Sequence, residues 1–107
     1  MFNIWKIIKR LFRWSTEYDV TIMQTKVKGE EKGYKQVYRL TLKAGSHDEA
    51  AQKIFQMFNV ADTLPKDFQA RYISTGDVIL IDEGTRGKFY YKLWSGGWKP
   101  VNRIQVR

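Results

Sequence analysis

The sequence predicts an α+β fold in which an antiparallel sheet of about five strands, arranged ββαβββ along the chain, packs against one helix. Residues 18–44 alternate apolar and polar side chains around a glycine-containing turn, as expected of a half-exposed hairpin. Residues 46–58 combine a capping box with apolar residues at helical spacing. Residues 71–101 contain three further strand-like runs joined by turns.

Length and composition indicate one folded domain. A chain of 107 residues can bury a single modest core, and its 43% hydrophobic content is too high for a disordered chain. Cysteine is absent from the sequence, which excludes disulfide and thiolate chemistry. The net charge is +8 and favours acidic partners. Four of the 19 basic residues and none of the 11 acidic ones lie in residues 1–14, so the remaining chain has a net charge of only +4.

Residues 1–14, MFNIWKIIKRLFRW, predict an amphipathic helix with an apolar half and a basic half. The basic residues are dispersed, unlike those of a signal peptide, and the stretch is too short and too charged to span a bilayer. We therefore expect residues 1–16 to form a membrane-surface helix and residues 17–107 to form the α+β domain. The alternative is a helix that packs on the domain's own sheet. The expected membrane-binding residues are Ile4, Trp5, Lys6, Ile7, Ile8, Lys9, Arg10, Leu11, Phe12, Arg13 and Trp14.

The first half of the domain is predicted to contain two strands and the helix. Tyr18–Val27 and Tyr34–Ala44 have the β-branched and aromatic residues of strands, and Lys28–Gly33 is the turn between them. The helix covers about residues 47–58. Val60–Gln69 contains a proline and is expected to be an irregular connection with at most one helical turn.

The second half is predicted to be a three-stranded meander. Residues 78–82 are apolar on both faces, which favours a central strand. Residues 88–94 form the next strand, and Ser95-Gly96-Gly97 turns the chain into a last strand over Trp98–Val106. Pro100 lacks an amide hydrogen, so this strand either starts near it or lies at an edge of the sheet.

The residues available for catalysis are few. His47 lies in the first turn of the helix, where an exposed polar residue needs no further role, and Asp77, Asp82 and Glu83 are expected to serve as turn residues. The chain has no cysteine or His/Asp cluster at metal-ligand spacing, and residues 84–87 lack the setting of a phosphate loop. We expect no catalytic residues, no metal and no cofactor, and hence a protein that is not an enzyme.

A nucleic-acid-binding module is the alternative function. Residues 86–91, RGKFYY, partly match the basic-glycine-aromatic strand of RNA-recognition sheets. The predicted order of hairpin, helix and meander differs from that fold, and a net charge of +4 outside residues 1–14 is a weak electrostatic signal.

Three stretches, GYKQVYRLTLKA, FNVADTLPKDFQARYISTGDVILIDEG and YYKLWSGGWKPVNRI, resemble the YodL-like domain family of spore-forming bacilli. The resemblance covers about Tyr18 to Arg107 and leaves out the N-terminal helix. Gly76 departs from the family pattern, in which many members have serine before the aspartate. The family's motif positions correspond here to Ser74, Asp77, Tyr90, Tyr91 and Trp98.

The resemblance implies a sporulation-associated cytoplasmic protein that is not an enzyme and affects cell shape through MreB, the actin homologue beneath the bacterial membrane. In the leading hypothesis the N-terminal helix holds the domain at an anionic membrane surface, on the inner face of the cell membrane. An exposed face of the sheet then binds the MreB-type partner. The expected partner-binding residues are Tyr90, Tyr91, Trp94 and Trp98.

Overall fold

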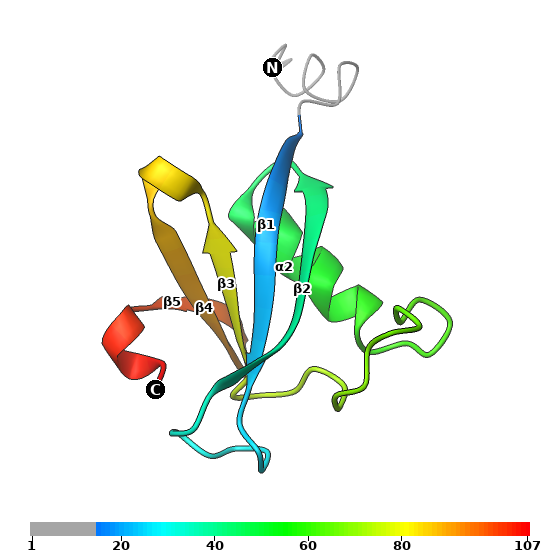
Figure 1. Ribbon diagram of the computed structural model, residues 1–107, viewed down its shortest axis with the longest axis vertical. Helices are drawn as coiled ribbons and strands as arrows, with labels where there is room; N and C mark the ends of the chain where they lie inside the picture. Colours follow the sequence, from blue (N-terminus) through cyan, green and yellow to red (C-terminus); the bar gives the residue numbers. More distant parts are fainter. Residues whose placement is uncertain (1–14) are drawn as a thin grey trace.

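A computed structural model describes residues 15–107, which form a five-stranded sheet and one helix (Figure 1). The predicted amphipathic helix of residues 1–14 lies outside the described residues. The strands and the helix are β1 (Thr16–Gln24), β2 (Lys35–Ala44), α2 (His47–Met57), β3 (Val78–Asp82), β4 (Lys88–Trp94) and β5 (Gly97–Val101). The predicted α+β class and the ββαβββ order are therefore confirmed for this part of the chain.

The sheet is antiparallel throughout and has the strand order β2-β1-β3-β4-β5. Its central strand is β3, as the apolar character of both faces predicted, and Val78 through Ile81 are all buried. β5 lies at one edge, which accommodates Pro100 because an edge strand needs fewer amide donors.

The prediction that the last strand extends to Val106 is wrong. β5 ends at Val101, and a 3-10 turn over Arg103–Gln105 follows. The side chain of Asn102 accepts a hydrogen bond from the Gln105 amide at 3.1 Å, and the Gln105 side chain accepts one from the Asn102 amide at 3.0 Å. These reciprocal bonds stabilise the turn and end the strand.

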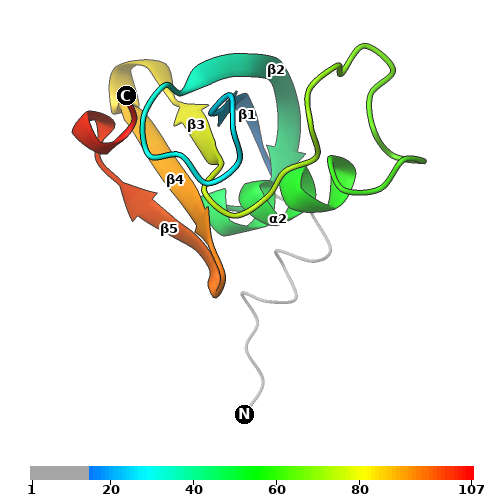
Figure 2. The ribbon, with the colours of Figure 1, turned by 90° about the horizontal axis from the view of Figure 1, so that it is seen from below.

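The helix α2 begins as the capping residues predicted. Ser46 Oγ accepts a hydrogen bond from the Glu49 amide at 3.1 Å, while the Glu49 carboxylate accepts one from the amide of Gly45 at 2.9 Å. The helix lies across one face of the sheet (Figures 1 and 2). We call this the helix-covered face and the opposite one the outer face. Ile54 and Phe58 point from the helix into the core, where both are fully buried.

The connection from α2 to β3 contains turns but no helix or strand. Phe68 anchors it to the core, with its ring 4.8 Å from that of Phe58 in an edge-on arrangement. At the other end of the chain, the carbonyl oxygen of Arg107 accepts hydrogen bonds from the amides of Gly33 and Tyr34 at 2.5 and 2.9 Å. The last residues are thereby fixed to the loop between β1 and β2.

Candidate functional site

The four aromatic residues predicted to bind a partner do not share one surface. Leu93 of the core pairs with Trp98, so Trp98 and Tyr91 lie on the helix-covered face. Tyr90 and Trp94 alternate on β4 with Tyr91 and Leu93 and therefore start from the outer face, because successive side chains of a strand point in opposite directions. The expectation of a single exposed face was wrong for this reason, while partner binding by each residue stays a prediction.

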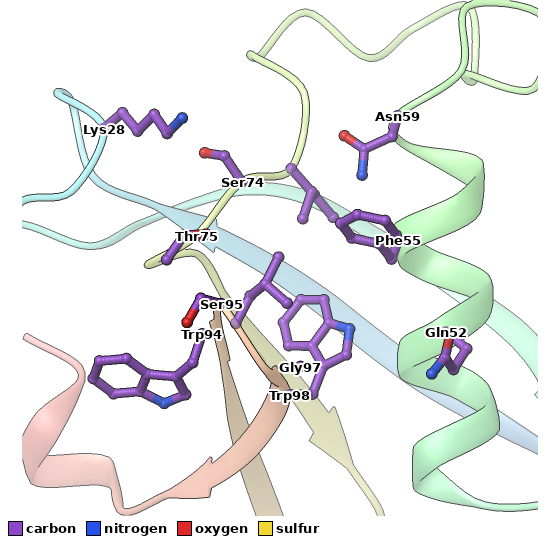
Figure 3. Close-up of a pocket in the computed structure, with 12 residues that line it drawn as sticks. Lys28, Gln52, Phe55, Asn59, Ser74, Thr75, Trp94, Ser95, Gly97 and Trp98 are labelled. Atoms are coloured by element: carbon purple, nitrogen blue, oxygen red, sulfur yellow. The ribbon is translucent and has the colours of Figure 1, made fainter.

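A groove separates α2 from the end of the β4–β5 hairpin (Figure 3). Its volume is about 440 Å³, within the range of ligand pockets. Phe55 projects into it from the helix, and Trp94 and Trp98 line it from the β4–β5 hairpin. Phe55 is 40% exposed. Buried Ile73 and Leu93 also line it. The groove is therefore a depression with both apolar and polar lining, whose walls come from four separate segments of the chain.

Two polar atoms in the wall of this groove have no hydrogen-bond partner within the described chain. They are Asn59 Nδ2 and Ser74 Oγ, and both atoms are buried. An unpaired buried donor or acceptor destabilises a fold by about 1–3 kcal/mol. A bound molecule with a carbonyl or carboxylate oxygen would pair with them. Lys28 is the one charged residue among those that line the groove, and it favours an anionic group at the rim.

Asp77, predicted to be a turn residue, follows a turn and is also buried, with a side chain that is 1% exposed. Its carboxylate accepts hydrogen bonds from the Ser74 amide at 2.9 Å, from Gln24 Nε2 at 3.0 Å and from Arg71 Nη2 at 2.9 Å. Burial raises the pKa of this carboxyl group, although these three donors oppose the shift. Asp77 thus fixes the loop that presents Ser74 to the groove.

His47 also differs from its prediction as a simple exposed residue. Its side chain is 20% exposed, and Nδ1 lies 2.6 Å from the hydroxyl oxygen of Tyr91. Nε2 lies 3.5 Å from a carboxylate oxygen of Glu83, and the rings of Tyr18 and Phe89 contact the imidazole edge-on. These contacts connect the start of α2 to β4, and burial raises the pKa of Tyr91.

Sequence reasoning did not identify Phe55, Asn59 or Lys28 as residues of a site. Phe55 was assigned to the core because it fits the helical apolar repeat, yet it lies at the margin of that repeat and reaches the groove. The available signal was the adjacent apolar pair Ile54 and Phe55, of which only Ile54 is in the core.

Comparisons with known proteins place this sequence among relatives of one kind. The profile of the YodL-like domain matches residues 2–102. The uncharacterized protein YodL of Bacillus subtilis (strain 168) is 52% identical over 93 residues, covering 87% of this chain and 89% of the relative. No solved structure matches. The profile begins at residue 2, so the expectation that the shared domain leaves out the N-terminal stretch was wrong.

Proposed function

This chain belongs to the YodL-like domain family, and from that membership we propose that it is a non-enzymatic binding protein that acts on bacterial cell shape. Its partner in this proposal is an MreB-type actin-like protein at the inner face of the cell membrane. The name of the Bacillus subtilis relative states no activity. The resemblance of the sequence to this family supports the choice of an MreB-type partner, and the groove supports a role in binding.

The observation that carries the proposal is the groove between α2 and the β4–β5 hairpin. Aromatic side chains that stay half exposed beside a pocket are typical of the anchor positions of protein interfaces. Phe55 and Trp98 have this setting, and Asn59 and Ser74 add unpaired polar atoms in the same wall. A projecting apolar side chain of the partner, followed by a carbonyl or carboxylate oxygen, would fit both features.

Attachment to the membrane is a separate part of the proposal. It is supported by the amphipathic pattern of residues 1–14, with its exclusively basic polar half. Within residues 15–107 no helix is long and apolar enough to cross a bilayer.

Co-sedimentation with filaments of a purified MreB-type protein tests the proposal. The intact chain should pellet with the filaments, and Phe55→Glu should reduce the pelleted fraction by at least about tenfold, as loss of an interface anchor does. Val60→Glu is the matched control, since Val60 is 49% exposed and does not line the groove. The proposal fails if the intact chain does not pellet, or if both variants pellet as it does.

A further inference from the structure

The outer face of the β4–β5 hairpin alternates basic and aromatic side chains. Lys88, Tyr90, Lys92 and Trp94 follow one another at every second position of β4. On β5, Lys99 lies opposite Lys92 and Val101 lies opposite Tyr90. Because a strand rises about 3.3 Å per residue, the rings of Tyr90 and Trp94 emerge about 13 Å apart.

Each of these two rings borders a hollow that also contains basic side chains. The first hollow has a volume of about 490 Å³, and its lining includes Tyr90, Lys88 and Arg103 together with Phe89 and Tyr91 from the alternate positions of β4. The second has a volume of about 360 Å³, and its lining includes Trp94 together with Lys32, Lys92 and Arg107. Val101 lines both hollows and so lies between them. The surface therefore repeats one unit, an aromatic ring with cations beside it.

The charges of this surface are poorly compensated. Within residues 15–107, no carboxylate forms an ion pair with Lys88, Lys92, Lys99 or Arg103. Lys92 and Lys99 are directly opposite each other, an arrangement that destabilises a sheet. Lys92 Nζ lies 4.7 Å from the ring centre of Trp94, which holds a cation at the edge of the second hollow. Among the residues that line the two hollows, Glu31 is the one with an acidic side chain.

We propose that this surface binds single-stranded nucleic acid, with bases stacked on Tyr90 and Trp94 and phosphates at the neighbouring lysines and arginines. A polymer that repeats one ring and one anion matches the repeated unit of the surface. An anionic membrane is the poorer match, because its plane does not enter two separate hollows. The low net charge of the chain outside residues 1–14 does not reveal this surface. Apart from Glu31 in the second hollow and Asp82 opposite Lys88, the acidic residues lie away from it.

The proposal is separable from the function proposed above, because Trp94 is the one residue that lines both the groove and either of the two hollows. Binding of the full chain to a fluorescently labelled, mixed-sequence single-stranded oligonucleotide tests it, measured by anisotropy at two salt concentrations. We expect measurable binding that weakens as salt rises. Trp94→Ala should weaken it between about fivefold and about a hundredfold, the range for loss of one stacked base.

Charge variants separate a specific surface from general attraction to a basic protein. Lys92→Glu with Lys99→Glu should weaken binding by more than about tenfold and flatten its salt dependence. Lys26→Glu with Lys66→Glu makes the same change of net charge at exposed lysines that line neither hollow, and should change binding by less than about threefold. Circular dichroism of each variant confirms that it is folded.

Three results would overturn the proposal. The first is absence of oligonucleotide binding by the intact chain. The second is an equal loss in both lysine pairs with no effect of Trp94→Ala, which would mean attraction to net charge alone. The third is equally tight binding of polyglutamate or of phosphatidylglycerol vesicles through the same residues, which would assign the surface to an acidic protein or to a membrane. The filament assay with Phe55→Glu is read separately, so either proposal can fail alone.

Discussion

Arg71 Nη2 lies 2.9 Å from a carboxylate oxygen of Asp77, and the two side chains differ sharply in their access to water, at 29% and 1% exposed. The pair closes the loop that leads into β3. Gln24 of β1 also donates to this carboxylate, and Gln24 donates to the carbonyl of Arg71 at 2.9 Å. One buried charge therefore joins the central strand, its neighbour β1 and the loop beside the groove.

Asp77→Ala should destabilise the domain by about 3 kcal/mol, because it leaves Gln24 and the Ser74 amide without their acceptor and removes the partner of Arg71. This loss of stability is at the lower end of the range of about 3–5 kcal/mol for removing one partner of a buried ion pair, since Arg71 retains some access to water. Urea denaturation measures the change. Asp62→Ala, at an exposed position, should shift stability by less than about 0.5 kcal/mol. Equal stability of the two variants would contradict the structural role of Asp77.

The raised pKa of Asp77 predicts the sign of its pH dependence. The pKa of its carboxyl group is higher in the folded chain than the ordinary value of 3.8, so the folded state binds the proton at a higher pH than the unfolded state. The free energy of unfolding therefore gains from this group as the pH falls from the raised pKa toward 3.8. The free energy of unfolding of the intact chain should therefore rise, relative to that of Asp77→Asn, over this interval. Denaturation curves at several pH values measure the difference.

Asp19 serves as a control, because its pKa is shifted in the opposite direction to that of Asp77. Its hydrogen bonds with Arg39 lower the pKa of its carboxyl group below 3.8. The stability contributed by this group is present above pH 3.8 and is lost as pH falls further. The intact chain should lose stability relative to Asp19→Asn only in that acidic range. If the stability difference from the intact chain changes with pH in the same direction for Asp77→Asn and Asp19→Asn, the opposite pKa shifts of the two groups are refuted.

Trp98→Ala and Trp94→Ala should differ in stability because the two rings lie on opposite faces. Trp98 packs against the core from the helix-covered face, so its removal should lower the free energy of unfolding by about 2–3 kcal/mol, less than for a fully buried tryptophan. Trp94 is 42% exposed and should change it by less than about 0.5 kcal/mol. Far-ultraviolet circular dichroism during thermal unfolding compares them. A similar loss in both variants would contradict the division of the hairpin into two faces.

Removal of residues 1–14 should leave a folded domain, since residues 15–107 form the sheet, the helix and a buried cluster between them. The intact chain should bind anionic vesicles through apolar burial together with about 1 kcal/mol for each basic residue at the surface. Added salt should weaken this binding, and the fluorescence of Trp5 or Trp14 should shift to the blue.

Ile8→Asp alone, or Lys6→Glu combined with Arg10→Glu, should release the protein from the vesicles. A shortened chain that aggregates or melts far below the intact one, together with an intact chain that ignores anionic vesicles, would show that this segment packs on the domain instead.

Local signals predicted the elements of the fold. The Ser46–Glu49 capping pattern located the start of α2, and the two-sided apolar run of residues 78–82 located the central strand. The burial of Asp77 had no such signal, because two of its donors come from Gln24 and Arg71, and Gln24 is 53 residues away. Contacts of this kind depend on strand order, which a single sequence does not specify.

The surfaces were predicted less well than the elements. Simple alternation along β4 would have separated Tyr90 from Tyr91, yet both were assigned to one face. The two hollows beside the β4–β5 hairpin depend on Val101, Arg103 and the loop at Lys32, which come together only because the C-terminal turn folds back. The sequence also contains the capping pattern of Asn102 and Gln105 that ends β5, and the predicted strand to Val106 did not take this pattern into account.

Pro100 has a consequence for how copies of this protein behave at high concentration. Edge strands with free amide and carbonyl groups act as templates onto which further strands add, and such lateral growth leads to aggregation. Pro100 removes one amide donor near the end of β5, and the other edge, β2, carries the exposed charged residues Lys35, Arg39 and Lys43. Both borders of the sheet are thereby protected, and Pro100→Val would open one of them to self-association without altering the buried core.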